Sequence, residues 1–401
     1  MRADAYREYM YDLIASVLRQ IGPRESCSDN ERRLGQLLAE RWRGVGHEVR
    51  VERFTCHPKA FLGFVPFSAL LYLAATVFYW VWPPLCVILA AISSAAIVLE
   101  LLRYREFVDP LFPEAEGENV VAVIQPRAEV RQRVVVSAHQ DSAYEFNLWY
   151  FLKTAGVPIM VIAFAAILVP LVGGAAKVMA GTAAADARVF DIIGYVCLGL
   201  YPFVGLNLFF HTYSVVPGAM DDLAGISVLA GLAKALADGR DGTATPVLAH
   251  TEVVVLAAAA EEAGLRGAKR YVAAHLAELK ALPTYGLFVD GVYDERHLTV
   301  VHREVSTGTR HDPRLVALAK DIAKRNGWSI RGGVVPFGST DASTFSLAGV
   351  PAVLLLCQDI VHLVPNYHTR LDTIDRVRPQ SLVVTLQMLL DMIQHIDEHG
   401  V

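Results

Sequence analysis

The feature that most constrains this chain is a run of 40 residues, 60–99, in which no side chain carries a charge. A helix needs about 20 residues to cross the hydrocarbon core of a bilayer, so the run is long enough to cross, turn and return. Pro83 and Pro84 lie near its centre, in the sequence WVWPP, and favour a turn there. The run therefore predicts a transmembrane hairpin. Helices buried in a large soluble core are the alternative, but they rarely extend for about 20 residues without a charge.

A second apolar block has the same pattern. Residues 154–176 are uncharged, a Gly/Ala-rich stretch with Lys177, Asp186 and Arg188 follows, and residues 192–220 are uncharged again. Aromatic side chains that favour the headgroup region flank the apolar runs, namely Tyr79, Trp80, Trp82, Trp149 and Tyr150. We therefore expect four spans, arranged as two hairpins, in a multi-pass protein of the cell (inner) membrane.

The composition agrees with lipid contact and disfavours other partners. The 401 residues are 54% hydrophobic and only 19% charged, which is too apolar for an ordinary soluble protein. The formal net charge of -5 provides no general attraction for nucleic acid, so we expect none as a partner. The five cysteines are odd in number and widely spaced, which favours neither a disulfide framework nor a cysteine zinc site and fits a reducing compartment.

Outside the apolar blocks, β-rich runs alternate with helical patterns. The N-terminal 22 residues have the pattern of an amphipathic helix, and a second helix is expected after Ser28 or Asp29, ending near Gly44 or Gly46. Strands are expected at NVVAVI, RVVVSAH, TEVVVLAAAA, YGLFVDG and PAVLLLC. Apolar strands alternating with helices predict an α/β fold in which helices cover both faces of a mostly parallel central sheet.

The simplest organisation is one catalytic domain that carries two membrane insertions. Both hairpins return to the side from which they start, so all parts of the α/β domain would lie on one side of the bilayer. The expected catalytic parts are residues 1–58, 103–152 and 213–401, and the expected hairpins are residues 60–102 and 154–212.

Polar residues recur where the predicted strands end, which is where α/β sheets bind ligands. They are His139 and Asp141, Asp221 and Asp222, Glu261 and Glu262, Asp290, and His368. Each alone has an ordinary explanation, such as a hydrogen-bonded strand end, a helix N-cap, a turn residue or an exposed loop histidine. Together, their imidazoles and carboxylates suit zinc, with cobalt or manganese as substitutes. The two histidines and three of these carboxylates would suffice for two zinc ions that share one carboxylate.

The order and wording of these motifs resemble the co-catalytic di-zinc aminopeptidases of metallopeptidase family 28, whose relatives include glutamate carboxypeptidase and the glutaminyl cyclases. The motifs are GPRESCSDNERRLGQLLAERWRGVGHEV, GENVVAVI, VVVSAHQDSA, PGAMDDLAGISVLAGLAKAL, EEAGLRGAKRYV, FVDG, STDASTFSLAGVPAV and YHTRLDT. Two departures stand out: Ala224 replaces the usual serine, and a whole hairpin separates the His-x-Asp motif from Asp221. The hairpin places lipid near the expected site.

The resemblance implies a role for each residue. Asp221 would bridge two zinc ions, of which one is also held by Glu262 and His368 and the other by His139 and Asp290. Glu261 would be the general base and Asp141 would orient His139, while Asp341 and Asp372 would line or support the site.

These roles predict a membrane-bound zinc peptidase, most simply an aminopeptidase that acts on a peptide or another amide. The alternatives are an amidase acting on lipid-linked or N-acyl amino acids, a glutaminyl-cyclase-like transferase, and an inactive receptor with a peptidase fold. Retention of all five ligand positions and of Glu261 disfavours the receptor.

The distribution of lysine and arginine predicts the orientation. Six basic residues flank the spans on the catalytic side, whereas Lys177 and Arg188 lie in the opposite loops; the six are Arg50, Arg53, Lys59, Arg103, Arg105 and Lys153. Because positive residues are enriched on the cytoplasmic side, we expect the catalytic domain to be cytoplasmic.

Overall fold

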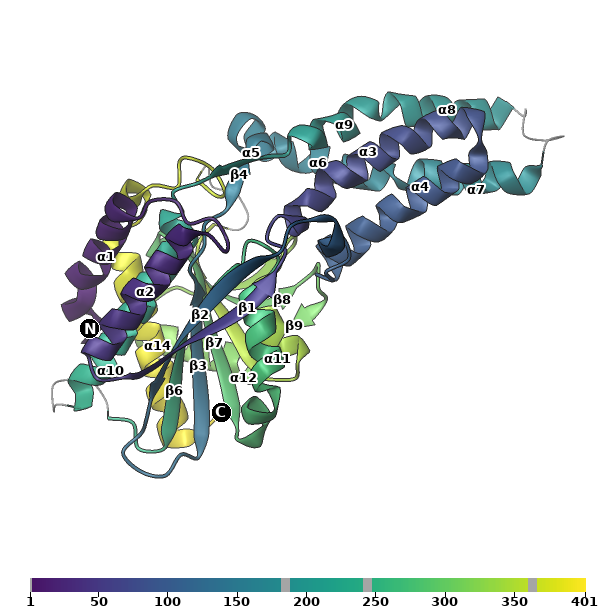
Figure 1. Ribbon diagram of the computed structural model, residues 1–401. Helices are drawn as coiled ribbons and strands as arrows, with labels where there is room; N and C mark the ends of the chain where they lie inside the picture. The colour runs from purple at the N-terminus through teal and green to yellow at the C-terminus, as the bar shows by residue number, and fades with distance from the viewer. Residues whose placement is uncertain (1, 182–187, 241–246, 360–365) are drawn as a thin grey trace. The chain divides into compact units, whose positions relative to one another are not determined.

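The chain forms two compact units in the computed structural model, which describes residues 2–181, 188–240, 247–359 and 366–401 (Figure 1). Unit 1 comprises residues 1–58, 114–144 and 215–401, and unit 2 comprises residues 59–113 and 145–214. The two predicted hairpins fall within unit 2. Asp186, which the sequence places between the third and fourth spans, lies outside the described residues.

Unit 1 is built around a nine-stranded sheet (Figure 1). The strands lie in the order β1-β2-β6-β3-β7-β11-β8-β10, and β9 pairs with β8. Their bounds are β1 Glu48–Cys56, β2 Ala115–Ile124, β3 Gln132–His139, β6 Thr251–Ala258, β7 Thr284–Val292, β8 Leu298–Glu304, β9 Thr309–Arg310, β10 Arg331–Val335 and β11 Ala352–Cys357. A separate two-stranded sheet pairs β4 (Tyr144–Phe146) with β5 (His211–Val215).

The centre of the sheet is parallel, as predicted. Strands β6, β3, β7 and β11 are parallel neighbours, and they contain four of the five predicted runs. The flanks differ from the prediction, because β2 pairs antiparallel with both β1 and β6, and β11 pairs antiparallel with β8. The fold is therefore α/β with a mixed sheet, and its parallel part is central.

Helices cover both faces of this sheet. Successive side chains of a strand alternate between the two faces of a sheet. Val136 packs with its register neighbours Val255 and Leu287 in the core of one face. Val135 and Val254 belong to the core of the other face. The first face is covered by α1 (Arg7–Gln20), α2 (Asp29–Gly44), α10 (Ala224–Arg240), α12 (Pro313–Arg325) and α14 (Pro379–His399). The second is covered by α11 (Arg266–Ala281) and α13 (Asp341–Leu347).

Helix α2 begins and ends where the sequence predicts. The hydroxyl of Ser28 accepts a hydrogen bond from the backbone N–H of Glu31, which satisfies one of the unpaired donors of the first turn. Acidic side chains in the first turn and Arg41 and Arg43 in the last turn complement the helix dipole, and the helix ends at Gly44.

Unit 2 consists of apolar helices. The first pair is α3 (Ala60–Val81) and α4 (Pro83–Ala96), with a π-helical turn, Ile97–Leu102, after α4. The turn between them lies at Trp82, and Pro83 occupies the first position of α4, as the WVWPP sequence predicts. The remaining helices are α5 (Asn147–Leu152), α6 (Gly156–Ala166), α7 (Leu168–Ala180), α8 (Arg188–Gly199) and α9 (Tyr201–Leu206). Within the described part of the chain, four helical stretches are long and apolar enough to cross a membrane.

Glycine and tyrosine residues bring the helices of unit 2 close together. A Cβ atom on Gly194 would lie 2.2 Å from the ring of Trp80, so only glycine fits at this crossing. The hydroxyls of Tyr72 and Tyr79 donate hydrogen bonds to the carbonyls of Cys197 and Phe190.

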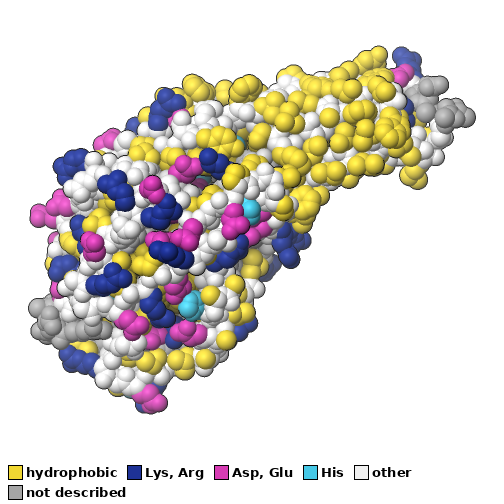
Figure 2. Space-filling view, viewed as in Figure 1, with side chains coloured by type: hydrophobic (Ala, Val, Ile, Leu, Met, Phe, Trp, Pro, Cys, Tyr) yellow, Lys and Arg dark blue, Asp and Glu magenta, His cyan; other side chains and the backbone are white. Residues whose placement is uncertain are grey.

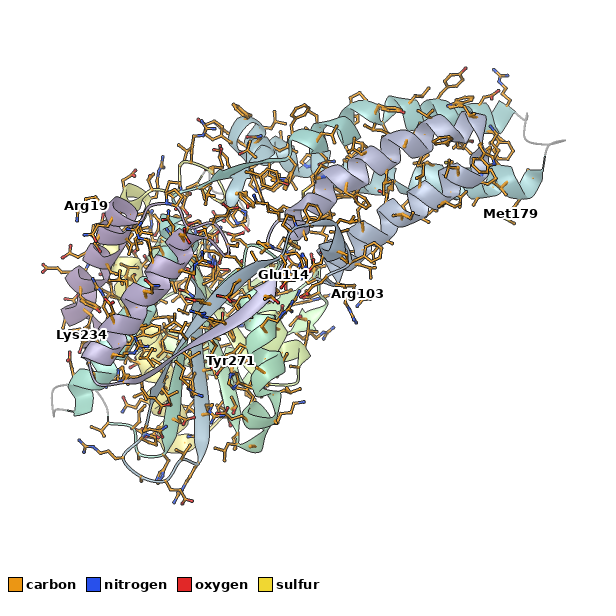
Figure 3. The ribbon with its side chains drawn as sticks, viewed as in Figure 1. Arg19, Arg103, Glu114, Met179, Lys234 and Tyr271 are labelled. Carbon is orange, nitrogen blue, oxygen red and sulfur yellow. The ribbon has the colours of Figure 1, made fainter. Side chains whose placement is uncertain are left out.

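The outer surface of unit 2 is apolar. Figure 2 shows hydrophobic side chains gathered over its helices, and Val81, Val172 and Tyr195 are 74%, 65% and 65% exposed. Arg103 and Met179 lie at opposite ends of the unit (Figure 3). An exposed apolar surface of this kind suits contact with lipid.

Candidate metal centre

The five predicted ligands converge at one edge of the central sheet. His139 is the last residue of β3, Asp290 lies near the end of β7, and Glu261 and Glu262 follow the end of β6 by three and four residues. Because these three strands are parallel neighbours, their carboxyl ends meet at the same edge. Asp221 reaches this edge from the turn before α10, and His368 joins it from a loop before α14.

The distances divide the ligands into two groups that share one carboxylate. Asp221 Oδ1 lies 3.1 Å from His139 Nε2, and Asp221 Oδ2 lies 3.1 Å from His368 Nε2. In the first group, one donor atom each of His139, Asp221 and Asp290 lie within 4.8 Å of one another. In the second, the same holds for Asp221, Glu262 and His368, with His368 Nε2 3.2 Å from Glu262 Oε1.

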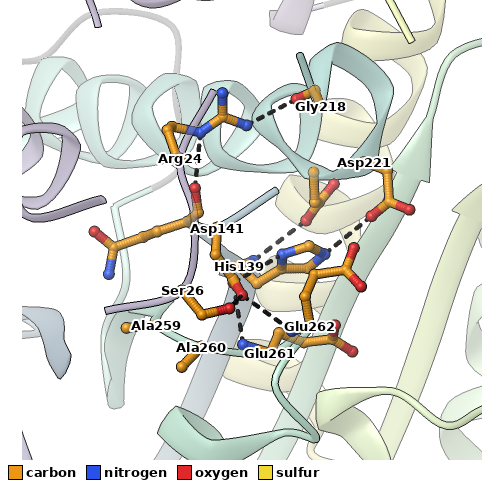
Figure 4. A network of polar contacts seen from close by, with 12 residues as sticks. Arg24, Ser26, His139, Asp141, Gly218, Asp221, Ala259, Ala260, Glu261 and Glu262 are labelled. Atoms are coloured by element: carbon orange, nitrogen blue, oxygen red, sulfur yellow. Dashed lines mark hydrogen bonds and ion pairs between the residues drawn. The ribbon is translucent and has the colours of Figure 1, made fainter. Parts of the chain in front are cut away.

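Asp141 connects the histidine to the glutamate pair. Its carboxylate is fully buried, and Oδ1 lies 3.3 Å from His139 Nδ1. The backbone N–H groups of Glu261 and Glu262 each donate a hydrogen bond of 3.0 Å to this carboxylate, and the hydroxyl of Ser26 donates a third of 2.6 Å (Figure 4). Burial alone would raise the pKa of Asp141, but His139 and these donors lower it below the ordinary value. Asp141 therefore stays ionised and fixes both partners.

Asp221 and Asp222 have different tasks although they are adjacent. The carboxylate of Asp222 accepts hydrogen bonds from the backbone N–H groups of Gly225 and His139, so it caps α10 and ties the helix to β3. The carboxylate of Asp221 faces the two histidines instead. The buried carboxylate of Asp372 accepts the N–H groups of Met220 and Asp221 and so fixes the backbone of the shared ligand.

Burial dominates the electrostatics of the acidic side chains. It raises the pKa of Glu261 well above the ordinary value, and the nearby carboxylates of Glu262, Asp341 and Asp290 raise it further, against the opposing effect of His139. Burial likewise raises the pKa of Asp290 to about 7 and that of Asp341 to about 8. So many acids in one buried place repel each other unless a cation compensates them.

The histidines show the complementary effect. Burial alone would lower the pKa of His368, but Glu262 and Asp221 raise it to about 10. Burial alone would raise the pKa of Asp221, but hydrogen bonds to His139 and His368 lower it strongly. The histidines and carboxylates therefore stabilise each other's charged forms.

The donor set fits divalent zinc. Both oxygens of Asp341 are buried and make no hydrogen bond among the described residues. Imidazole nitrogen and carboxylate oxygen are the usual ligands of catalytic zinc, and a bound dication would remove the repulsion between the acids.

Four further residues shape this centre, and no local pattern in the sequence identifies them. The ring of Tyr367 stacks on that of His368 with a centroid distance of 4.0 Å. Glu31 is buried and accepts the backbone N–H groups of Cys27 and Ala260, which holds Ala260 in the left-handed region, with φ 53°, directly before Glu261. Ser26 and Arg24, the other two, lie in the same N-terminal loop and act through side-chain hydrogen bonds. Only the tertiary contacts identify these roles.

A family model matches the part of the chain that contains most of these residues. Residues 207–393 match the family model described as Peptidase family M28. The matched part contains Asp221, Glu261, Glu262, Asp290 and His368, whereas His139 and Asp141 come from the part before it. A search of the curated proteins finds no match to this chain.

Solved structures share the fold at low sequence identity. The zinc aminopeptidase BSAP from Bacillus subtilis is 16% identical, with a TM-score of 0.57 over 97% of this chain and 94% of that one. The aminopeptidase from Aneurinibacillus sp. strain AM-1 is 14% identical, with a TM-score of 0.56 over 97% and 93%. A glutaminyl cyclase from Bacteroides thetaiotaomicron is 14% identical, with a TM-score of 0.55 over 98% and 97%. At these identities the likeness establishes the fold alone.

Proposed function

Because residues 207–393 belong to peptidase family M28, we propose that this metallopeptidase is a membrane-bound aminopeptidase that uses two zinc ions and Glu261 to hydrolyse an amide bond. The observation that carries the proposal is the pair of ligand groups that share Asp221. One zinc ion would be held by Asp221, Glu262 and His368, and the other by Asp221, His139 and Asp290. Cobalt or manganese would suit the same donors.

The two glutamates take different roles in this proposal. Glu262 Oε1 lies 3.2 Å from His368 Nε2, among the ligands of the second group. Glu261 is held by its N–H bond to Asp141, and its carboxylate lies within 4.8 Å of donor atoms of His139 and Glu262. When bound, zinc would polarise the scissile carbonyl and lower the pKa of water. Glu261 takes the proton of the attacking water and gives it to the leaving amine.

We propose that the phenol of Tyr367, whose ring stacks on that of His368, supplies a hydrogen-bond donor to the substrate. Burial raises the pKa of its phenol well above the ordinary value, and Asp221, Glu262, Asp290 and Glu261 raise it further. The phenol therefore keeps its proton and would donate a hydrogen bond to the negative charge that develops on the carbonyl oxygen.

A glutaminyl-cyclase-like transferase is the second candidate, because two solved glutaminyl cyclases have this fold. An amidase acting on lipid-linked or N-acyl amino acids is the third, because unit 2 has an apolar surface suited to lipid. The complete first group, with His139 and Asp290 beside Asp221, favours a two-zinc hydrolase over a cyclase.

The test is a substrate screen with a zinc count on the full-length protein in detergent. The substrates are aminoacyl amides, peptides, peptides with N-terminal glutamine and N-acyl amino acids. We expect two zinc ions per chain and release of N-terminal residues. One zinc ion per chain together with cyclisation of N-terminal glutamine would replace the proposal with the transferase, and hydrolysis of N-acyl amino acids alone would replace it with the amidase.

We propose further that unit 2 spans the bilayer four times and that unit 1 faces the cytoplasm. The basic residues at the span ends support this orientation, as does the length of the four apolar helices. In intact cells, a membrane-impermeant thiol reagent should label Trp82→Cys, whose native side chain is 56% exposed at the α3–α4 turn, but not Lys153→Cys. Labelling of Lys153→Cys alone would reverse the topology.

A further inference from the structure

Arg24 is a fully buried arginine. Among the described residues, its side chain donates hydrogen bonds only to backbone carbonyls. Its Nε donates to the carbonyl of Gln140 over 2.8 Å and Nη1 to that of Pro217 over 3.0 Å. Its Nη2 donates to the carbonyl of Gly218 over 2.8 Å (Figure 4). A weaker bond of 3.3 Å reaches the carbonyl of Gly22 in its own loop. One guanidinium thus joins three separate segments of the chain.

Two of these segments carry metal ligands. Gln140 stands directly after His139, whereas Pro217 and Gly218 stand shortly before Asp221. Residues 145–214 between them belong to unit 2, so the backbone of unit 1 is interrupted between the two ligands. Closing so long a loop costs conformational entropy, which the contacts at its ends must offset. Other contacts close the same gap as well: β4 pairs with β5, the N–H of Val216 donates to the carbonyl of Ala143, and the N–H of His139 donates to the carboxylate of Asp222.

Gly218 allows the guanidinium to approach this closely. Its φ is +63°, in the left-handed region that favours glycine. A Cβ atom there would lie 2.9 Å from Arg24 Nη2 and 2.5 Å from the hydroxyl oxygen of Ser142. The backbone of Ser142 is also tied to the arginine, because its N–H donates to the carbonyl of Arg24 over 2.8 Å.

The charge of Arg24 complements the acidic centre. Burial lowers the pKa of the guanidinium to about 10, and Asp372, Asp141, Asp222 and Glu31 act in the opposite direction. The side chain therefore remains charged at neutral pH. Lysine would keep the charge but not the fork of N–H groups, which reaches carbonyls in several directions at once.

We propose that Arg24 is a positioning residue that holds the His139 segment against the Asp221 segment and thereby preorganises the metal centre across the interrupted chain. This inference rests on the proposed zinc centre. It requires that Arg24 act on zinc affinity, beyond any contribution to the stability of the fold.

The experiment compares Arg24→Gln and Arg24→Lys with Arg133→Gln as a matched control. Arg133 is buried as Arg24 is, and it belongs to the strand that carries His139, but it lies at the start of β3, about 20 Å from His139. It is paired there with Glu252 and Glu278. The readouts are zinc affinity, by competition with a chromophoric chelator, and the urea midpoint of the metal-free protein.

We expect Arg24→Gln to lower zinc affinity by about 10- to 100-fold, the range seen when outer partners of metal ligands are lost. Arg24→Lys should recover part of that loss, and Arg133→Gln should lower the urea midpoint with zinc affinity within about 2-fold of wild type. Unchanged affinity in both Arg24 variants, or an equal loss in Arg133→Gln, would overturn the inference. Because chelator competition needs no turnover, failure of the aminopeptidase proposal leaves this test intact, whereas a wild-type protein that binds no zinc would overturn both.

Discussion

Glu261→Gln should leave both zinc ions bound and lower kcat by about 10³-fold, within the range that general bases contribute. The amide keeps the size of the side chain and the backbone N–H bond to Asp141, so the turn that carries Glu262 is preserved. It removes the one function that glutamine cannot supply, which is uptake of a proton from water. Zinc content and kcat on one aminoacyl amide, measured on the same preparation, check this result.

Glu262→Gln is the informative comparison, because the two side chains are adjacent and the substitution is the same. Its carboxylate lies among the ligands of Asp221 and His368, so this variant should lose zinc affinity first and activity in consequence. Normal turnover in Glu261→Gln would remove Glu261 from the mechanism. Loss of zinc in Glu261→Gln with retention of zinc in Glu262→Gln would exchange the roles of the two glutamates.

The central part of the fold follows from the sequence because its signals are local. Apolar runs of five to ten residues identify β2, β3, β6, β7 and β11, and a glycine or a cap marks the ends of several helices. The strands β1, β8 and β10 were not predicted. They are short or carry charged residues, such as Arg50 and Arg303, and only their place beside stronger strands makes them part of the sheet.

At the metal centre, too, local sequence signals predict some residues, whereas only tertiary contacts identify the others. The ligands stand at strand ends, so their convergence follows from the parallel order of the strands. Arg24, Ser26 and Glu31 lie far from the ligands in sequence and act through hydrogen bonds that the chain order does not reveal. The capping role of Asp222 could be expected from its position before α10. The role of its neighbour Asp221 follows only from the contacts of its carboxylate with both histidines.

Asp221→Asn should release both zinc ions, whereas Asp290→Asn should release one. Asp221 places one carboxylate oxygen 3.1 Å from each of the two histidine Nε2 atoms, so each group depends on it. Asparagine offers a single uncharged acceptor oxygen and cannot serve both groups. Asp290 belongs to one group only, so its loss leaves Asp221, Glu262 and His368 intact.

Zinc per chain, measured after dialysis against a chelator of moderate affinity, separates the two variants. Asp294→Asn is the matched control, because Asp294 is as buried as Asp221, lies four residues after Asp290 and binds Arg296 instead of the centre. It should retain two zinc ions. If Asp221→Asn kept one ion and Asp290→Asn lost both, Asp290 would be the shared ligand and the two groups would have to be redrawn around it. Loss of both ions in Asp221→Asn alone would identify Asp221 as the ligand on which both groups depend.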